Sequence, residues 1–205
     1  MADQSLTRNQ QKEQTRSNIL QAALEEFSLR GYDGTNVRAI AEKAGVNHGL
    51  IKYYFEGKEN LWKEAVGFMF QRHAEEVVYV ESDDLEESIR EYIRSYTRYC
   101  ARHPEHTRIM LQASMHGRER LEWAIEHFLM PNKEALVSAI EMEKGLGILP
   151  NVPTVSLIYT IVSSCQLVFA LAAEVDILYG VDVNNSDFIE NHADSIADLV
   201  IQKRR

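Results

Sequence analysis

The chain has 205 residues and a formal net charge of −9 at pH 7, with 45% hydrophobic and 26% charged residues. This composition excludes disordered and fibrous proteins and fits a soluble globular protein of one large or two small domains. The N-terminal segment MADQSLTRNQQKEQTR has no apolar stretch of the kind found in signal peptides. Cys100 and Cys165 lack any spacing suited to zinc. We therefore expect a cytoplasmic protein with reduced, buried thiols and with no metal or cofactor.

Helical periodicity runs through the whole sequence, and no stretch alternates like a half-buried strand. The predicted fold is therefore all-α. A first helix is expected over about 14–30 and ends at Gly31. Thr35 is placed to cap a second helix, which Gly45 ends in a tight turn.

The segment VNHGLIKYYF, residues 46–55, contains the third and shortest predicted helix, which Asn47 caps. It brings a histidine, a lysine and two tyrosines together around a glycine. A core helix would distribute its polar groups differently, so the pattern indicates a partner outside the chain.

A long fourth helix is predicted to follow Gly57 and to continue to about Val80. The acidic segment ESDDLEES comes next, where Asp83 or Asp84 can cap a fifth helix whose first turn holds further carboxylates. Pro104, Gly117 and two loop segments bound the remaining helices, which gives about nine in total. The later ones are expected at 87–102, 105–116, 119–143, 154–179 and 187–203.

Residues 155–173, VSLIYTIVSSCQLVFALAA, carry no charge and are long enough in principle to cross a bilayer. Serine, threonine and glutamine recur along the segment, and no basic cluster flanks it. We therefore expect no membrane span but a helix buried between other helices or at a subunit interface.

Charge is distributed unevenly along the chain. Residues 1–60 hold 8 Lys/Arg and 8 Asp/Glu, whereas the rest hold 14 and 23, which accounts for the whole net charge. The segment from residue 35 to residue 58 contains four basic residues but only two acidic ones, Glu42 and Glu56. The basic ones are Arg38, Lys43, Lys52 and Lys58. The local positive charge thus coincides with the two short helices.

Two short helices joined by a four-residue turn that contains glycine are typical of a helix-turn-helix, whose second helix enters the DNA major groove. That groove, about 12 Å wide, accepts one helix with polar, aromatic or small side chains facing the bases. Five residues meet this requirement: Asn47, His48, Gly49, Lys52 and Tyr53. Val46, Leu50 or Ile51, and Phe55 could hold the helix onto the first two.

The sequence TNVRAIAEKAGVNHGLIKYYFEGKENLWKEAV, residues 35–66, closely resembles the DNA-binding signature of the TetR (tetracycline repressor-like) family of bacterial transcription regulators. The resemblance implies a helix-turn-helix DNA-binding domain over 1–60 and an effector-binding and dimerisation domain over 61–205. It also implies a repressor that binds double-stranded DNA.

The resemblance assigns roles position by position. Thr35 would cap the second helix and touch a phosphate, and Arg38 would contact a phosphate one turn later. His48 and Gly49 would occupy the groove-facing start of the recognition helix, where glycine lets the backbone approach DNA.

Tyr54 and Lys58 match phosphate-contacting positions of the family. Two positions depart from its pattern. Asn47 replaces the usual serine, and its side chain can likewise accept hydrogen bonds from the free N–H groups at the helix start. Lys52 replaces a frequent tyrosine, so a charge contact could replace a phenol-to-phosphate hydrogen bond.

One short recognition helix contacts few base pairs, so useful specificity calls for two copies on a palindromic site. The predicted helices 154–179 and 187–203 offer two apolar stripes and resemble the pair that forms the family's four-helix dimer interface. On the second, the stripe consists of Ile189, His192 or Ala193, Ile196 and Val200.

Helices five to seven resemble the family's core for an unknown small-molecule effector, and such pockets are mostly apolar with a few polar groups. His103 and His106 flank Pro104 and are expected to be surface or capping residues rather than metal ligands. The candidate pocket residues are Phe68, Tyr96, Met110, Ser114, Trp123, His127, Phe128 and Gln166.

Two other functions remain open from the sequence. One is an all-α enzyme that uses His127 or the acidic cluster, although the chain has no nucleophile–base pair and no phosphate-binding glycine loop. The other is a DNA-binding protein without an effector. A non-enzymatic, ligand-responsive regulator is the prediction.

Overall fold

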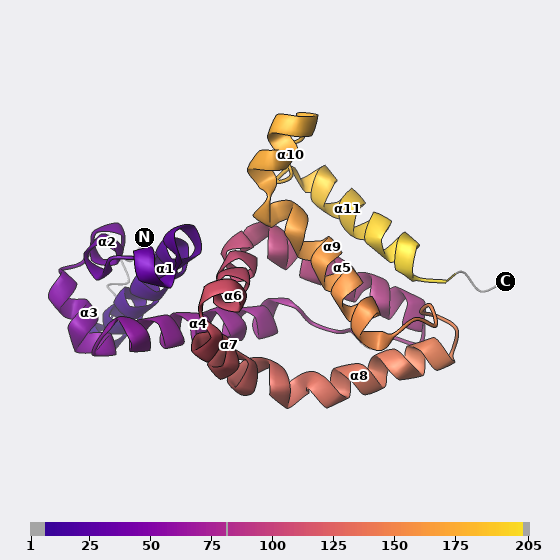
Figure 1. Ribbon diagram of the computed structural model, residues 1–205, viewed down its shortest axis with the longest axis horizontal. Helices are drawn as coiled ribbons and strands as arrows, with labels where there is room; N and C mark the ends of the chain where they lie inside the picture. The colour runs from indigo at the N-terminus through magenta and orange to yellow at the C-terminus, as the bar shows by residue number, and fades with distance from the viewer. Residues whose placement is uncertain (1–6, 81, 203–205) are drawn as a thin grey trace.

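The computed structural model describes residues 7–80 and 82–202, and within these ranges it contains helices and no strand (Figure 1). The all-α prediction is confirmed. The described helices are α1 (Arg8–Gly34), α2 (Val37–Lys43), α3 (His48–Phe55), α4 (Lys58–Glu76), α5 (Leu85–Arg102), α6 (Pro104–His116), α7 (Arg118–Ala124), the π-helical turn η1 (Ile125–Leu129), α8 (Met130–Gly145), α9 (Thr154–Ala170), α10 (Ala172–Tyr179) and α11 (Ser186–Val200).

Helix α1 begins earlier than predicted because a capping box starts it. The Thr7 hydroxyl accepts a hydrogen bond from Gln10 N at 3.4 Å, and the Gln10 side chain accepts one from Thr7 N at 2.8 Å. Gly31 adopts φ 70°, which ends the regular helix where the sequence predicted. Residues 1–6, inside the first predicted domain, lie outside the described residues.

The helices α1–α4 share one apolar core at one end of the molecule (Figure 1). Helix α4 contributes to this core along most of its length and then runs toward the centre of the molecule, so it crosses the predicted domain boundary at residue 60. The fully buried core members include Ile19, Leu24 and Phe27 of α1, Ile40 of α2, Ile51 and Phe55 of α3, and Leu61, Ala65, Val66 and Met69 of α4.

Helix α4 ends at Glu76, so its predicted extension to Val80 is wrong. Val77 already has an extended conformation, with φ −104° and ψ 96°. The sequence VVYV that follows is rich in β-branched residues, which lose side-chain freedom in a helix. The chain therefore leaves the helix at Val77.

Helices α5, α9 and α11 form a second core in the C-terminal half. Asp84 caps α5, because its Oδ1 accepts hydrogen bonds from Glu86 N at 3.0 Å and Glu87 N at 3.3 Å; of the two predicted alternatives, the cap is Asp84. The buried side chains include Ile89 and Ile93 of α5, Leu157 and Cys165 of α9, and Ile196, Ala197 and Val200 of α11.

The stripe predicted for the dimer interface on the last helix is therefore largely internal. Ala193 is fully buried, and Ile196 and Val200 are 3% and 6% exposed. Ile196 and Val200 pack against residues of α5 and α9 in the second core of the same chain. Residue 203, the last of the predicted span, lies outside the described residues.

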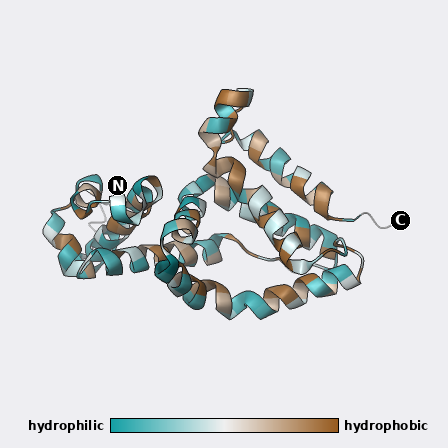
Figure 2. Cartoon of the chain, viewed as in Figure 1, coloured by the Kyte–Doolittle hydropathy of each residue, from teal (hydrophilic) through white to brown (hydrophobic). Residues whose placement is uncertain are grey.

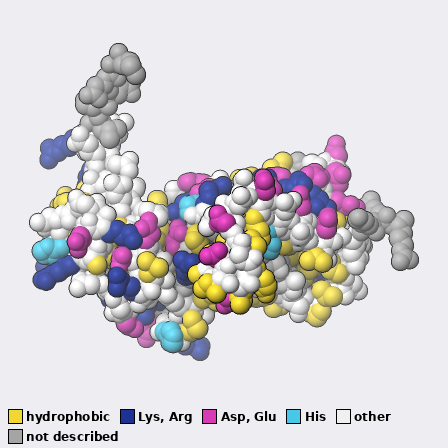
Figure 3. Space-filling model, turned by 90° about the horizontal axis from the view of Figure 1, so that it is seen from above, with side chains coloured by type: hydrophobic (Ala, Val, Ile, Leu, Met, Phe, Trp, Pro, Cys, Tyr) yellow, Lys and Arg dark blue, Asp and Glu magenta, His cyan; other side chains and the backbone are white. Residues whose placement is uncertain are grey.

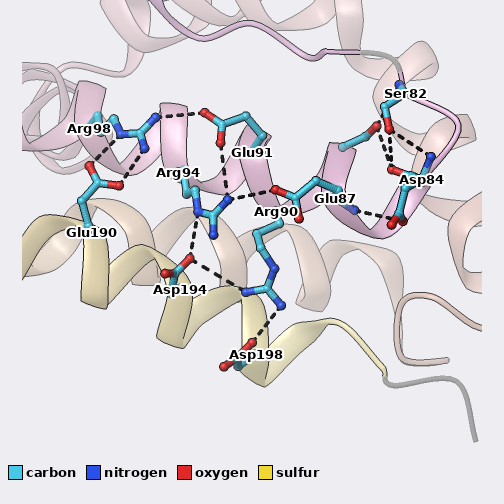
Figure 4. Close-up of polar contacts among 11 residues, drawn as sticks. Ser82, Asp84, Glu87, Arg90, Glu91, Arg94, Arg98, Glu190, Asp194 and Asp198 are labelled. Atoms are coloured by element: carbon cyan, nitrogen blue, oxygen red, sulfur yellow. Dashed lines mark hydrogen bonds and ion pairs between the residues drawn. The ribbon is translucent and has the colours of Figure 1, made fainter.

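Three arginines of α5 join it to α11 by ion pairs (Figure 4). Arg90 pairs with Asp198 at 2.8 Å, and Arg94 pairs with Asp194 at 2.8 Å. Arg98 pairs with Glu190 at 2.7 Å. The arginines and their partners each recur at four-residue spacing, so the two antiparallel helices present matching rows of charge.

Two predicted single helices are interrupted. Within the predicted helix 119–143, the Met130 N–H donates to the carbonyl of Ile125 in the π-helical pattern. Pro131, which has no N–H, follows directly, so it cannot donate to the carbonyl of His127. The predicted helix 154–179 bends by 73° between α9 and α10, where Leu171 leaves helical geometry.

Hydrophobic residues cover much of α9 and α10 (Figure 2). Within the part of the chain that the structure describes, no single helix is long and apolar enough to cross a membrane, whereas α9 and α10 together meet the length and composition but are bent. Cys165 lies on the buried face of α9, and Cys100 lies in α5; both are buried free thiols, as predicted. Burial raises the pKa of Cys165 to about 11.

Candidate nucleic-acid interface

The turn between α2 and α3 is closed by two backbone hydrogen bonds. Val46 N donates to Ala41 O at 2.9 Å, and Gly45 N donates to Glu42 O at 3.1 Å. Gly45 has φ 68°, the left-handed conformation that glycine adopts without a steric penalty. This closed turn fixes the direction in which α3 leaves α2.

Asn47 caps α3 as predicted, because its Oδ1 accepts a hydrogen bond from Gly49 N at 2.9 Å. A Cβ atom at position 49 would lie only 3.2 Å from that same oxygen. Glycine therefore leaves room for the cap and keeps the start of α3 free of a side chain. Both effects favour close approach of this backbone to a partner.

Helix α3 has one buried and one exposed face. Ile51 and Phe55 are each 1% exposed and anchor it in the N-terminal core, whereas Leu50 is 37% exposed. Of the two alternatives left open by the sequence, the anchor is therefore Ile51. The exposed face carries Asn47, His48, Gly49, Lys52 and Tyr53, with Tyr53 70% exposed.

Thr35 does not cap α2, so that prediction is wrong. The cap is Asn36, whose Oδ1 accepts from Arg38 N at 2.9 Å. Thr35 is 4% exposed, and its hydroxyl donates to the carbonyls of Gly31 at 2.7 Å and Glu26 at 3.1 Å. The Thr35 hydroxyl thus stabilises the end of α1 and is not free to bind a phosphate. Both residue types favour caps, and tertiary packing decides between them.

The basic residues near α3 divide into free and engaged groups. Arg38 and Lys52 are exposed. Lys43 is engaged with Glu25 at 2.9 Å and Glu26 at 3.4 Å, and its hydrogen bond to Glu25 is the main cause of its raised pKa.

Two further lysines lie beside aromatic rings. Lys58 Nζ lies 4.7 Å from the ring centre of Tyr32. Lys12 of α1 lies about as close to Tyr54 as to Tyr53, with Nζ 5.9 Å and 6.0 Å from the two ring centres. No local pattern in the sequence points to Lys12, since only folding brings α1 beside α3. Lysine, arginine and histidine side chains lie at the end of the molecule formed by the N-terminal helices (Figure 3).

The eight predicted pocket residues do not come together in one site. Tyr96 donates to the Gln166 amide oxygen at 3.1 Å between α5 and α9. Ser114 and His127 are exposed, and each hydrogen-bonds within its own helical segment. The other four are half-buried and pack against the N-terminal core: Phe68, Met110, Trp123 and Phe128.

A different region of the C-terminal half forms a cleft of about 810 Å³. It lies between the segment after α4, helix α5 and helix α8, and none of the eight predicted residues lines it. Its lining residues are Tyr79, Ser82, Asp83, Leu85, Ile89, Tyr92, Leu136, Ala139, Met142 and Glu143.

His106 is half-buried and packs among aromatic rings, so its prediction as a surface or capping residue is wrong. Its ring lies 4.9 Å from Phe70, centre to centre, and its Nδ1 lies 2.8 Å from the Tyr99 hydroxyl. Burial lowers the pKa of His106 to about 3, and the nearby His73 and Arg72 act in the same direction. His103 lies at the start of α6, with Nε2 3.1 Å from Glu76.

Comparison with known proteins agrees with this architecture. The profile of the family described as "Bacterial regulatory proteins, tetR family" matches residues 19–65, and that of "YcdC-like protein, C-terminal region" matches residues 70–205. The HTH-type transcriptional repressor NicS of Pseudomonas putida is 33% identical over 111 residues, which cover 53% of this chain and 52% of that protein. The chain thus aligns with about half the length of NicS.

Similarity to other proteins extends over most of the chain. The HTH-type transcriptional regulator RutR of Escherichia coli K12 is 26% identical over 188 residues, which cover 90% of this chain and 87% of RutR. A TetR family transcription regulator from Marinobacter aquaeolei VT8 has the same fold, with a TM-score of 0.67 at 19% identity, covering 95% of this chain and 100% of that one. With its helix-turn-helix and its matched C-terminal region, the chain belongs to the TetR family of bacterial regulators, the DNA-binding proteins that control transcription.

Proposed function

We propose that this chain represses transcription by binding a palindromic operator as a homodimer, and that a small-molecule effector releases it. The observation that carries the proposal is the two-sided character of α3. Ile51 and Phe55 fix the helix in the core, while His48, Lys52 and Tyr53 are exposed on the other side. Such a helix can enter a major groove without losing its own packing.

Phosphate contacts set affinity and register, and contacts to base edges set sequence preference. We assign Arg38, Lys52, Tyr54 and Lys58 to phosphates, and His48 and Gly49 to the groove. Lys52 extends from the exposed face, so its ammonium group can reach a phosphate oxygen. The net charge of −9 opposes adhesion to DNA elsewhere on the surface.

Exposed apolar side chains on α9, α10 and α11 support the dimer. Val155 and Tyr159 of α9 are 67% and 66% exposed, Ile177 of α10 is 82% exposed, and Leu199 of α11 is 85% exposed. Apolar residues gathered on neighbouring helices mark an interaction surface more often than a free one. The interface we propose therefore uses the outer faces of these helices, opposite the stripe that packs inside the chain.

The cleft beside α5 supports the effector site, because about 810 Å³ lies within the range of small-molecule pockets. An effector can release DNA only by binding more tightly to the conformation whose recognition helices are wrongly spaced. A nearly complete switch needs about 5.5 kcal/mol of differential affinity. Helix α4, which shares the N-terminal core and ends beside the C-terminal half, is the element through which we expect this coupling.

Selection of bound fragments from the source genome tests the proposal. We expect the selected fragments to share a palindrome whose half-sites lie about one helical turn of DNA apart. Light scattering should show that the protein bound to it is a dimer. Binding of all sequences with equal affinity, or a monomer at the concentrations that bind DNA, would contradict it. Since its target is chromosomal DNA, we place the protein in the cytoplasm.

A further inference from the structure

The carboxyl group of Glu143 stands out among the buried acidic groups of the chain. Glu143 is only 6% exposed, yet its carboxylate has no hydrogen-bond or ion-pair partner among the described residues. Glu26 and Glu105 are buried to a similar degree, but Glu26 pairs with Arg30 at 2.9 Å and Glu105 with Arg72 at 2.6 Å. Neither oxygen of Glu143 is among the fully buried atoms without a partner, so the carboxylate keeps its remaining contact with solvent through the cleft. A carboxylate that has lost most of its water without gaining a partner is costly.

Glu143 lines the 810 Å³ cleft. The other charged residue in the lining is Asp83, and the described lining contains no lysine, arginine or histidine. Lys144, the next residue along α8, is engaged with Glu141 at 3.1 Å and with Thr154 at 3.0 Å. Both charged residues of the described lining are therefore acidic.

The remaining lining suits a partly aromatic or aliphatic guest. The rings of Tyr79 and Tyr92 lie 6.3 Å apart, centre to centre, on one side of the cleft. The face of a tyrosine ring attracts a cation. Leu85, Ile89 and Leu136 offer apolar surface for the rest of a ligand.

We propose that this cleft binds a small organic cation, an amine or a quaternary ammonium compound with an apolar body, whose charge lies beside Glu143. The inference rests on the proposed function, since it names the chemical class of the effector. A cation supplies the partner that Glu143 lacks, and the tyrosine rings add to the attraction. Burial without a partner raises the pKa of Glu143, and a bound cation would lower it again.

Three probes with one carbon skeleton test the charge preference by isothermal titration calorimetry at pH 7. They are 4-phenylbutylamine, 4-phenylbutanol and 4-phenylbutyrate, which are cationic, neutral and anionic. We expect the intact protein to bind the amine at least tenfold more tightly than the alcohol, and the alcohol more tightly than the carboxylate. Equal binding of all three, or a preference for the carboxylate, would overturn the inference.

Variants identify the residue responsible. Glu143→Gln should weaken amine binding about tenfold, or about 1.4 kcal/mol, while changing alcohol binding less than twofold. Glu134→Gln is the matched control, because Glu134 is exposed on the same helix and does not line the cleft. Met142→Lys, at a position 55% exposed, adds a positive charge to the cleft at a site that tolerates it; it should reverse the preference toward the carboxylate. A Glu143→Gln variant that binds the amine as the intact protein does would refute the role of Glu143.

Operator binding, measured separately, distinguishes this inference from the proposed function. If the amine binds through Glu143 but leaves the operator complex intact, the cation site is supported and the proposed release of DNA by an effector at this site is contradicted. If the protein releases its operator with 4-phenylbutyrate and not with the amine, effector release stands and the cation site is wrong.

Discussion

Arg98 holds Glu190 in a bidentate ion pair, with Nε and Nη2 each 2.7 Å from a different carboxylate oxygen (Figure 4). The pair joins α5 to α11 across 92 positions of the sequence. Glu91 accepts a further hydrogen bond from Arg98 Nη1 at 2.9 Å, so one guanidinium bridges two carboxylates. Planar guanidinium groups favour this geometry over single contacts.

Arg98→Gln should lower the free energy of unfolding by about 1 kcal/mol, the upper part of the range for partly exposed pairs, because the geometry is bidentate and belongs to a network. Urea denaturation measures the change, and a double-mutant cycle with Glu190→Gln isolates the pair. Arg118→Gln is the control, since its pair with Glu122 is largely exposed and should contribute almost nothing. An equal effect of both variants would contradict the role of the bidentate pair.

His106 should make the protein less stable below pH 6.5. Because its pKa in the folded protein is lowered to about 3, the unfolded chain takes up a proton near pH 6.5 that the folded chain does not. The stability it contributes is therefore present above pH 6.5 and is lost as pH falls toward 3. The slope of the unfolding free energy against pH reports how many protons the chain takes up on unfolding. Replacement of His106 with glutamine should lower that number by about one between pH 6 and 4. The same substitution at exposed His116 provides the comparison, and identical slopes would show the assignment to be wrong.

Thr35→Val should destabilise the protein by about 1–2 kcal/mol, because it removes the hydroxyl that donates to Gly31 O and Glu26 O. Thr35→Ser keeps the hydroxyl and should recover most of the loss. Since Thr35 is buried, the salt dependence of DNA binding should stay the same in both variants. A smaller salt slope for Thr35→Val, with stability unchanged, would instead support the phosphate contact that the family resemblance implied.

Lys58→Ala should weaken binding to all DNA sequences alike and reduce the salt slope of log K by about 1, the value for one lost phosphate contact. Fluorescence anisotropy between low and high salt measures this slope. Lys63→Ala serves as the control, because Lys63 lies on the same helix but pairs with Glu59 at 3.6 Å. An unchanged slope for Lys58→Ala would remove Lys58 from the interface.

His48→Ala should change which DNA sequence is preferred more than it changes total affinity. His48 is exposed at the first position of α3, where side chains reach base edges in helix-turn-helix proteins. Selection from a random DNA library, run in parallel with the intact protein, detects the change. Recovery of the same palindrome with the same base preferences would exclude His48 from base recognition.

The helix-turn-helix was predictable because its signals are local. Gly45 closes a turn through bonds within six residues, and Asn47 caps the helix that it precedes. The spacing of Ile51 and Phe55 then identifies the buried face. Only the cap of α2 was misplaced, since Thr35 and Asn36 are adjacent and packing against α1 determines which of them is buried.

The C-terminal half was less predictable because its features depend on distant contacts. No glycine or proline marks the bend at Leu171. Pro131 is a local signal for the interruption beside the π-helical turn, and the predicted helix 119–143 ran through it. Tyr92 and Glu143 belong to helices far apart in the chain, so only the folded structure brings them to one cleft. The eight residues selected as a pocket were plausible by type, but several pack into cores instead.

The rows of arginine and carboxylate between α5 and α11 have a consequence for folding. Their partners lie 92 to 108 positions apart, so these contacts form only after a long loop of chain has closed. During synthesis, α5 emerges well before α11 exists to cover it, and Ile93 meanwhile lacks part of its apolar surroundings. The N-terminal core also depends on distant contacts, because Ile109 of α6 and Ala124 of α7 belong to it. Both cores therefore wait for later parts of the chain, and the docking of α11, which comes last, is the step most exposed to aggregation.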